Sequence, residues 1–148
     1  MKRRILVDLN VVLDVLLDRA PHVEAAAAVW ELVERREAEA LLAAHCVTTL
    51  HYLATRSRGR DFGDRCVSDV LSVFAVAPVD RAVISAAVAL RWADFEDAVC
   101  AASAHAAGCH WITTRDPRGF KGSACPALTP TATLAALRAP LGRAPLGG

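Results

Sequence analysis

Residues 4–14 of the chain read RILVDLNVVLD, an apolar run that reaches a carboxylate and then changes its period. Residues 5–7 are consecutive and apolar, which indicates a strand buried on both faces, as in the centre of a parallel sheet. From Leu9 onward the apolar residues recur at helical spacing. We therefore expect a central strand that passes almost directly into a helix, with Asp8 where the two meet.

Asp8 is the first candidate functional residue. In open parallel sheets, ligands bind in the crevice outside the carboxyl ends of the strands, so a carboxylate in this position faces a cleft. An aspartate that precedes a helix can also serve as its N-cap. This segment alone leaves both roles open.

The rest of the chain alternates between helical and extended patterns. We expect further helices over residues 23–36, 48–56, 62–74, 80–92, 94–107 and 129–139. We expect further strands at residues 40–44, 74–79 and 109–114. This alternation predicts an α/β fold, a three-layer α/β/α sandwich with a central, mainly parallel sheet. We assign residues 1–139 to a single domain with a loop at 115–122, and residues 140–148 to a flexible C-terminal tail.

The composition indicates a compact domain that contacts no membrane. Of 148 residues, 54% are hydrophobic and 22% are charged, and no apolar run has the length of a membrane span. The amino terminus lacks the apolar region of a secretory signal, so we expect a cytoplasmic protein. The five cysteines include no C-x-x-C pair, which predicts buried thiols and neither disulfides nor a zinc knuckle. With a net charge of +1, any nucleic-acid binding must rest on local basic patches.

Three more acids are placed to join Asp8. Asp116 follows the last clear strand, as Asp8 follows the first, and Asp94 and Asp97 lie in the first turn of the preceding helix. Such carboxylates repel one another unless a cation lies among them, and Mg²⁺ or Mn²⁺ takes oxygen ligands of this kind. Asp94 and Asp97 taken alone also fit an ordinary helix cap.

These motifs, in this order, resemble those of the PIN domain family across nearly the whole chain. They are ILVDLNV at residues 5–11, DFEDA at 94–98, and TTRDP at 113–117 with Phe120. The resemblance implies an α/β/α metal-dependent nuclease, as in the VapC toxins of bacterial toxin–antitoxin pairs.

By that resemblance, Asp8, Asp97 and Asp116 are the catalytic and metal-binding acids, and the cofactor is Mg²⁺ or Mn²⁺. Asn10 and Thr114 match polar residues that flank the site. Two acids at a variant helix start are further candidate metal ligands, namely Asp94 and Glu96.

The chain departs from the family pattern at one position. Where PIN domains commonly have a glutamate early in the third helix, this chain has Thr49, a supporting polar residue without charge. Asp14 or Glu96 could supply the missing charge, although we expect Asp14 on a solvated helix face. His45 and His51 are not expected to substitute, because hard Mg²⁺ prefers oxygen. We therefore predict one tightly bound ion, with a second that binds weakly or arrives with the substrate phosphate.

Basic side chains in two turns are candidate RNA contacts: Arg56, Arg58, Arg60, Arg115, Arg118 and Lys121. The same residues could be solvated surface charges without a partner. The resemblance also implies a homodimer, and Trp30 and Trp92 add apolar surface beyond what one thin sheet needs.

The leading interpretation is a Mg²⁺- or Mn²⁺-dependent endoribonuclease, the toxin of a bacterial toxin–antitoxin pair, with RNA as its substrate and a cognate antitoxin as its partner. The alternative is a PIN-fold RNA- or protein-binding module with little or no catalysis, which Thr49 favours. Other classes lack their motifs: there is no G-x-S-x-G elbow and no glycine-rich phosphate loop after the first strand. A phospho-acceptor domain would need an aspartate at the end of a middle strand, where this chain has proline before Asp80.

Overall fold

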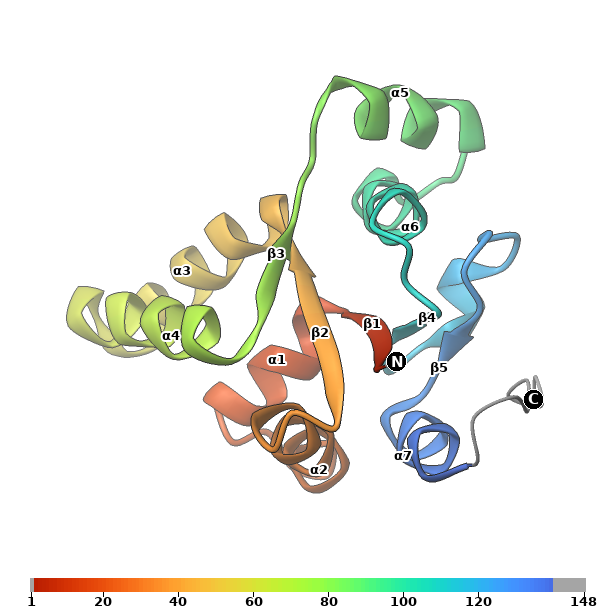
Figure 1. Cartoon of the computed structure of the whole chain (residues 1–148). Helices are drawn as coiled ribbons and strands as arrows, with labels where there is room; N and C mark the ends of the chain where they lie inside the picture. Colours follow the sequence, from red (N-terminus) through yellow and green to blue (C-terminus); the bar gives the residue numbers. More distant parts are fainter. Residues whose placement is uncertain (1, 140–148) are drawn as a thin grey trace.

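The structure is a computed structural model that describes residues 2–139, so the tail expected at residues 140–148 lies outside the described residues. Its elements, coloured along the chain in Figure 1, are β1 (Arg3–Val7), α1 (Leu9–Leu16), α2 (Val23–Glu34), β2 (Ala38–Ala43), α3 (Ala44–Arg58), α4 (Arg60–Val73), β3 (Ala75–Ala77), α5 (Arg81–Leu90), α6 (Phe95–Ala106), β4 (Trp111–Thr113), the 3-10 helix η1 (Pro117–Phe120), β5 (Ala127–Leu128) and α7 (Pro130–Arg138).

The strands form one parallel sheet in the order β3-β2-β1-β4-β5. β1 lies at its centre: Ile5 pairs with Ala40 of β2 on one side and with Trp111 of β4 on the other. Ile5 and Leu6 are completely buried, as expected for a strand covered on both faces. Because all strands run the same way, the carboxyl ends of β1, β2 and β4 meet at one edge.

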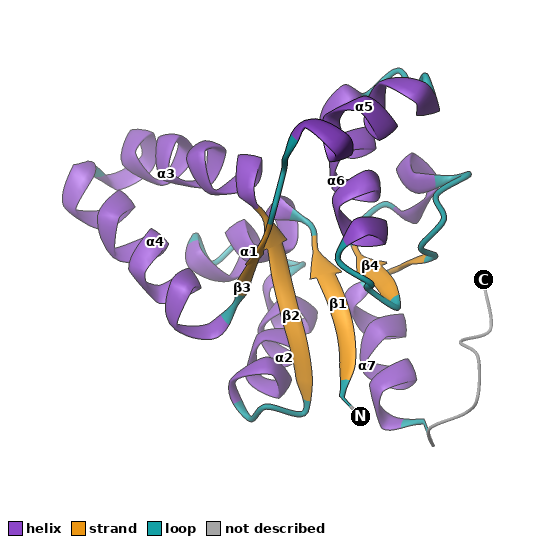
Figure 2. Ribbon diagram, turned by 45° about the horizontal axis from the view of Figure 1, so that its top comes forward, coloured by secondary structure: helices purple, strands orange, loops and turns teal. Residues whose placement is uncertain are grey.

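Helices cover both faces of the sheet, so the predicted three-layer α/β/α fold is confirmed. α1, α2 and α7 lie on one side and α5 and α6 on the other (Figure 1). α3 and α4 form a hairpin that projects beside β3, as both views show (Figure 2). The hairpin turns at a single residue, Gly59, whose φ of +90° is favourable for glycine. The two helices pack closely, because a Cβ added at Gly63 of α4 would overlap Thr55 Oγ1 of α3.

The start of α3 differs from the expectation. The helix begins at Ala44 and not at Thr48, and it follows β2 without an intervening residue. Residues 40–44 are alanine and leucine without a clear period, so local pattern could not locate the boundary. His45 and Cys46 therefore lie in the first turn of α3, at the carboxyl edge of the sheet.

Two elements near the C-terminus were not predicted as such. η1 forms within the segment expected to be a loop, and its last residue, Phe120, is buried. β5 has only two residues, Ala127 and Leu128, which is too short for a periodic signal. β5 pairs with β4, and η1 packs against α6 and begins with Asp116 as its N-cap and Pro117 as its first residue.

Side chains singled out in the sequence are placed as follows. Trp30 packs edge-on against Phe74 and Trp92 against Phe120, with ring centroids 4.9 and 6.1 Å apart, and both tryptophans remain partly exposed. All five cysteines are free and buried, as predicted. None of the helices in residues 2–139 has the length and apolar character needed to cross a bilayer.

Candidate functional site

Asp8 lies at the carboxyl end of β1 and immediately before α1, but its side chain makes no capping bond to that helix. Its backbone N–H donates to the Thr113 carbonyl at 2.8 Å. Its Oδ2 accepts a hydrogen bond of 2.9 Å from the hydroxyl of Thr114, a buried residue just after β4. The carboxylate is therefore oriented by β4 and not used for capping.

Burial raises the pKa of Asp8 above its ordinary value, and the charge of Glu96 adds to the rise. The hydrogen bond from Thr114 and the charge of Arg115 act in the opposite direction. The buried position of Asp8 therefore disfavours its ionised form.

The start of α6 brings three more acids to Asp8. Asp94 is the N-cap, and its Oδ1 accepts a 3.0 Å hydrogen bond from the backbone N–H of Asp97. Burial, followed by repulsion from Asp94, Asp8 and Glu96, raises the pKa of Asp97 to about 6. We refer to Asp8, Asp94, Glu96 and Asp97 as the acid cluster.

Asp116 approaches the acid cluster through Thr114 and η1. Its backbone N–H donates to Thr114 Oγ1 at 3.3 Å, so one hydroxyl contacts both Asp8 and Asp116. A Cβ built at Gly119 of η1 would lie 3.3 Å from Asp97 Oδ2. The Asp116 carboxylate itself is exposed and accepts from the backbone and the Nε of Arg118, at 3.3 and 3.1 Å.

The donor set fits a hard divalent ion. Its members offer carboxylate oxygens, and the raised pKa values of Asp8 and Asp97 mark negative charge that a cation would relieve. Within residues 2–139, no three carboxylates each place an oxygen within 4.8 Å of the others. Mg²⁺ does not require such closeness, because it keeps several water ligands and bridges through them.

The two supporting polar residues differ in their surroundings. Asn10 is an exposed residue of α1, and its carbonyl accepts from Arg19 Nη2 at 3.4 Å. Thr49 is half-buried on α3, one turn after His45. The hydrogen bond with Cys46 raises the pKa of His45, and the charge of Glu96 adds to the rise. Thr49 therefore lies one helical turn from a residue on which the charge of the acid cluster acts.

The six basic candidates fall into two separate groups. Arg56, Arg58 and Arg60 surround the turn between α3 and α4, at the outer tip of the hairpin (Figure 1). Arg56 donates to the Tyr52 hydroxyl at 3.1 Å and Arg58 lies over the Phe62 ring. The second group belongs to the segment after β4, beside the acid cluster: Arg115, Arg118 and Lys121.

Asp14 does not lie on a solvated helix face, and that expectation is wrong. Its side chain is completely buried on α1, with its carboxylate oxygens 3.0 Å from Arg19 Nε and 3.3 Å from Arg115 Nε. The period of α1 placed Asp14 among apolar residues but could not reveal that two arginines from elsewhere would approach it. Its charge is thus already paired.

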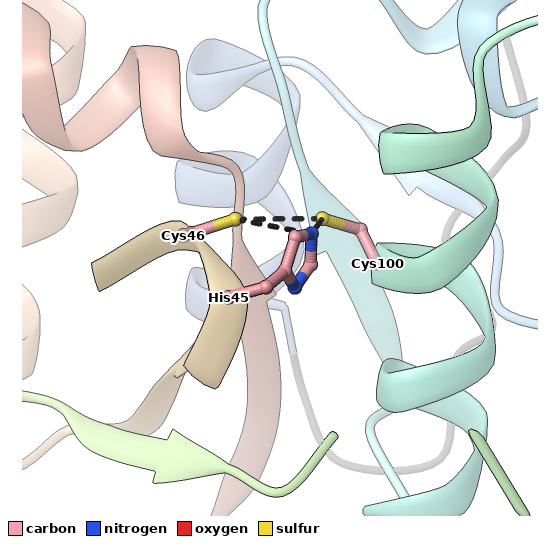
Figure 3. A group of neighbouring side chains, drawn as sticks. All are labelled: His45, Cys46 and Cys100. Atoms are coloured by element: carbon pink, nitrogen blue, oxygen red, sulfur yellow. Dashed lines mark hydrogen bonds between the residues drawn. The ribbon is translucent and has the colours of Figure 1, made fainter. Parts of the chain in front are cut away.

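Sequence reasoning missed a second group of donors, which Figure 3 shows. His45 and Cys46 of α3 face Cys100 of α6, with His45 Nε2 lying 3.6 Å from each sulfur and the sulfurs 3.7 Å apart. The hydrogen bond from Cys100, followed by that from His45, lowers the pKa of the Cys46 thiol below its ordinary value. Only the adjacent pair His45-Cys46 was visible in the sequence, because Cys100 lies 54 residues further on.

Comparisons with known proteins agree with this architecture. A family model described as "PIN domain" matches residues 4–118. No sequence among the curated proteins matches the chain.

Solved structures share the fold at low sequence identity. VapBC2 from Rickettsia felis, bound to a DNA fragment from its promoter, aligns with a TM-score of 0.68 and 13% identity over 85% of this chain and 98% of that one. FitAcB from Neisseria gonorrhoeae aligns with a TM-score of 0.67 and 20% identity, over 86% of this chain and 98% of that one. VapC20 from Mycobacterium tuberculosis is described as a sarcin–ricin loop cleaving toxin. It aligns with a TM-score of 0.61 and 17% identity, over 73% of this chain and 86% of that one.

The parallel sheet, the acids at its carboxyl edge and the family match over residues 4–118 lead to one conclusion. This chain belongs to the PIN domain family.

Proposed function

We propose that the chain is a Mg²⁺- or Mn²⁺-dependent endoribonuclease and the toxin of a bacterial toxin–antitoxin pair. The observation that carries the proposal is the acid cluster, in which Asp97 has a pKa raised to about 6 beside Asp8. Membership of the PIN domain family supports a nuclease. The similarity to structures described as VapBC and toxin–antitoxin complexes supports the toxin role and an antitoxin partner.

In this proposal Asp8, Asp97 and Asp116 hold the ion, with Glu96 and Asp94 beside them. When bound, the ion supplies an activated water as nucleophile and stabilises the charge that develops on the scissile phosphate. Thr114 keeps the Asp8 carboxylate at the end of β1 through its 2.9 Å hydrogen bond. Arg118 pairs with Asp116 in the free protein and is positioned to exchange that partner for an RNA phosphate.

The activity is tested with RNA and the purified full chain. We expect cleavage with Mn²⁺ or Mg²⁺, none with EDTA, and a loss of at least about 100-fold in Asp97→Asn. Asp80→Asn is the matched control, because Asp80 caps α5 through Val83 N–H outside the site and asparagine also caps helices. Wild-type cleavage by Asp97→Asn would refute the assignment.

The alternative is a PIN-fold binding module without turnover, and Thr49 is the observation that favours it. Thr49 offers a neutral hydroxyl on α3, one turn after His45, where the family pattern has a glutamate. RNA binding at full affinity without cleavage in any divalent metal would select this alternative.

Thr49 also bears on the number of ions. Two cations about 3.5–4 Å apart need anionic ligands between them, so we expect one tight ion in the resting protein. Thr49→Glu should tighten a second one. Calorimetric titration with Mn²⁺ checks this, and two equally tight sites in the wild type would contradict it.

We also propose a homodimer. Support comes from large apolar side chains exposed on α3, α5 and α6, which are Tyr52, Leu53, Ile84, Val88 and Phe95. Sedimentation should give a dimer at micromolar concentration, and a monomer at high micromolar concentration would count against it.

A further inference from the structure

The side chains of His45, Cys46 and Cys100 form a nearly equilateral triangle of donor atoms. The three edges are 3.6, 3.6 and 3.7 Å, and each edge runs between atoms that can bind a metal (Figure 3). A tetrahedral zinc centre with Zn–S of about 2.3 Å and Zn–N of about 2.0–2.1 Å has S···S edges of about 3.8 Å and S···N edges of about 3.6 Å. The observed triangle therefore has the size of one face of that tetrahedron.

The two sulfurs of this triangle are buried in the fold. Cys46 and Cys100 are each 2% exposed; Cys46 lies in the first turn of α3, directly after β2, and Cys100 lies on α6, which covers one face of the sheet. The first turn of α3 is closed by a 2.9 Å bond from Thr48 Oγ1 to the His45 carbonyl. Within residues 2–139, His45 Nδ1 is buried without a hydrogen-bond partner, and Nε2 is the ring atom that lies against the two sulfurs.

We propose that His45 Nε2, Cys46 Sγ and Cys100 Sγ bind a Zn²⁺ ion, with the fourth position left to an oxygen donor. Binding releases the two thiol protons to solvent and leaves the imidazole neutral. The site differs from the acid cluster in its choice of metal, because thiolates and imidazole select zinc whereas carboxylates and water suit Mg²⁺ or Mn²⁺.

The site can coexist with the acid cluster. Cys100 lies one helical turn after Asp97 on α6, so the two sites are neighbours. Zn²⁺ with two thiolates and a neutral imidazole carries no net charge and adds little repulsion toward a hard ion nearby. Its structural effect is to tie the start of α3 to α6. The inference does not depend on the proposed nuclease activity.

Cobalt substitution tests the site directly. The full chain, reduced and freed of metal by chelation, is titrated with Co²⁺. We expect one equivalent to produce thiolate-to-cobalt charge-transfer absorption and the intense visible bands of tetrahedral Co²⁺, and Zn²⁺ to abolish both. Cys46→Ser and Cys100→Ser each remove one of the two sulfur ligands. Each variant should therefore show a weaker charge-transfer band than the wild type.

Two controls separate this site from other causes. Cys66→Ser removes a buried cysteine of α4 outside the triangle and should keep the full spectrum. Asp97→Asn should also keep it, which separates zinc binding from the nuclease site. A wild-type spectrum with only the weak bands of octahedral Co²⁺ would overturn the proposal.

A measurement on the wild type avoids any folding defect of the variants. Zn²⁺ should slow alkylation of Cys46 and Cys100 at least tenfold, as followed by mass spectrometry, and leave Cys66 unchanged. Equal rates with and without Zn²⁺ would overturn the proposal. Formation of a Cys46–Cys100 disulfide that Zn²⁺ does not slow would do the same.

Discussion

The hydroxyl of Thr114 donates a 2.9 Å hydrogen bond to Asp8 Oδ2 and joins the carboxyl end of β4 to that of β1. Thr114→Val should weaken Mn²⁺ binding by about 10- to 100-fold, because a residue that orients a metal ligand typically carries that much affinity. Calorimetric titration checks this. Thr113→Val is the matched control: it breaks a buried 2.8 Å bond to Thr133 and should lower stability while leaving Mn²⁺ affinity unchanged.

Asp97 should make the metal-free protein sensitive to pH. Its pKa is about 6 in the fold against an ordinary value of 3.8, so the folded state binds more protons than the unfolded state between those values. The free energy of unfolding should therefore fall as pH rises from about 4 to 6, by on the order of 2 kcal/mol. Denaturation in EDTA at several pH values measures it. Asp97→Asn should flatten the curve in this range, and an unchanged slope would contradict the assignment.

Asp14 should be essential for stability. Its buried carboxylate lies 3.0 Å from Arg19 Nε and 3.3 Å from Arg115 Nε, so Asp14→Asn leaves two cations without their counter-charge. We expect a loss of about 1–3 kcal/mol in chemical denaturation, because the two arginines keep 37% and 31% of their side-chain surface exposed and water partly replaces the lost counter-charge. Glu31→Gln, which breaks an exposed pair with Arg35, should cost less than about 1 kcal/mol. Similar losses for the two variants would show that Asp14 is not a buried ion-pair centre.

The two basic groups should differ in their contribution to RNA affinity. Neutralising Arg118 and Lys121, beside the acid cluster, should reduce the log–log dependence of affinity on salt by roughly 0.7 for each RNA phosphate that the variant no longer neutralises. Neutralising Arg58 and Arg60 should change it less, because they lie at the far tip of the α3–α4 hairpin (Figure 1). Filter binding across a salt series, with an uncleavable RNA, measures both slopes. A larger change in the salt dependence for the Arg58 and Arg60 variant would instead indicate that the RNA binds along the α3–α4 hairpin.

The sequence by itself determined the central strand, most of the helices, the parallel three-layer fold and the position of Asp8, Asp97 and Asp116 at strand ends or a helix start. These features depend on local period and on the short-range order of residues along the chain, which can be read without knowing what lies across the sheet. The burial of the cysteines was predicted from the absence of a C-x-x-C pair among the five cysteines.

Only the tertiary structure decided which distant side chains meet. Arg115, from the segment after β4, forms an ion pair with Asp14 of α1. Cys100 of α6 lies against His45 and Cys46 of α3. Trp92 is partly buried because η1 places Phe120 against its ring. Each of these contacts joins segments far apart in sequence, and the periodicity of one segment carries no information about the side chains that another brings to it.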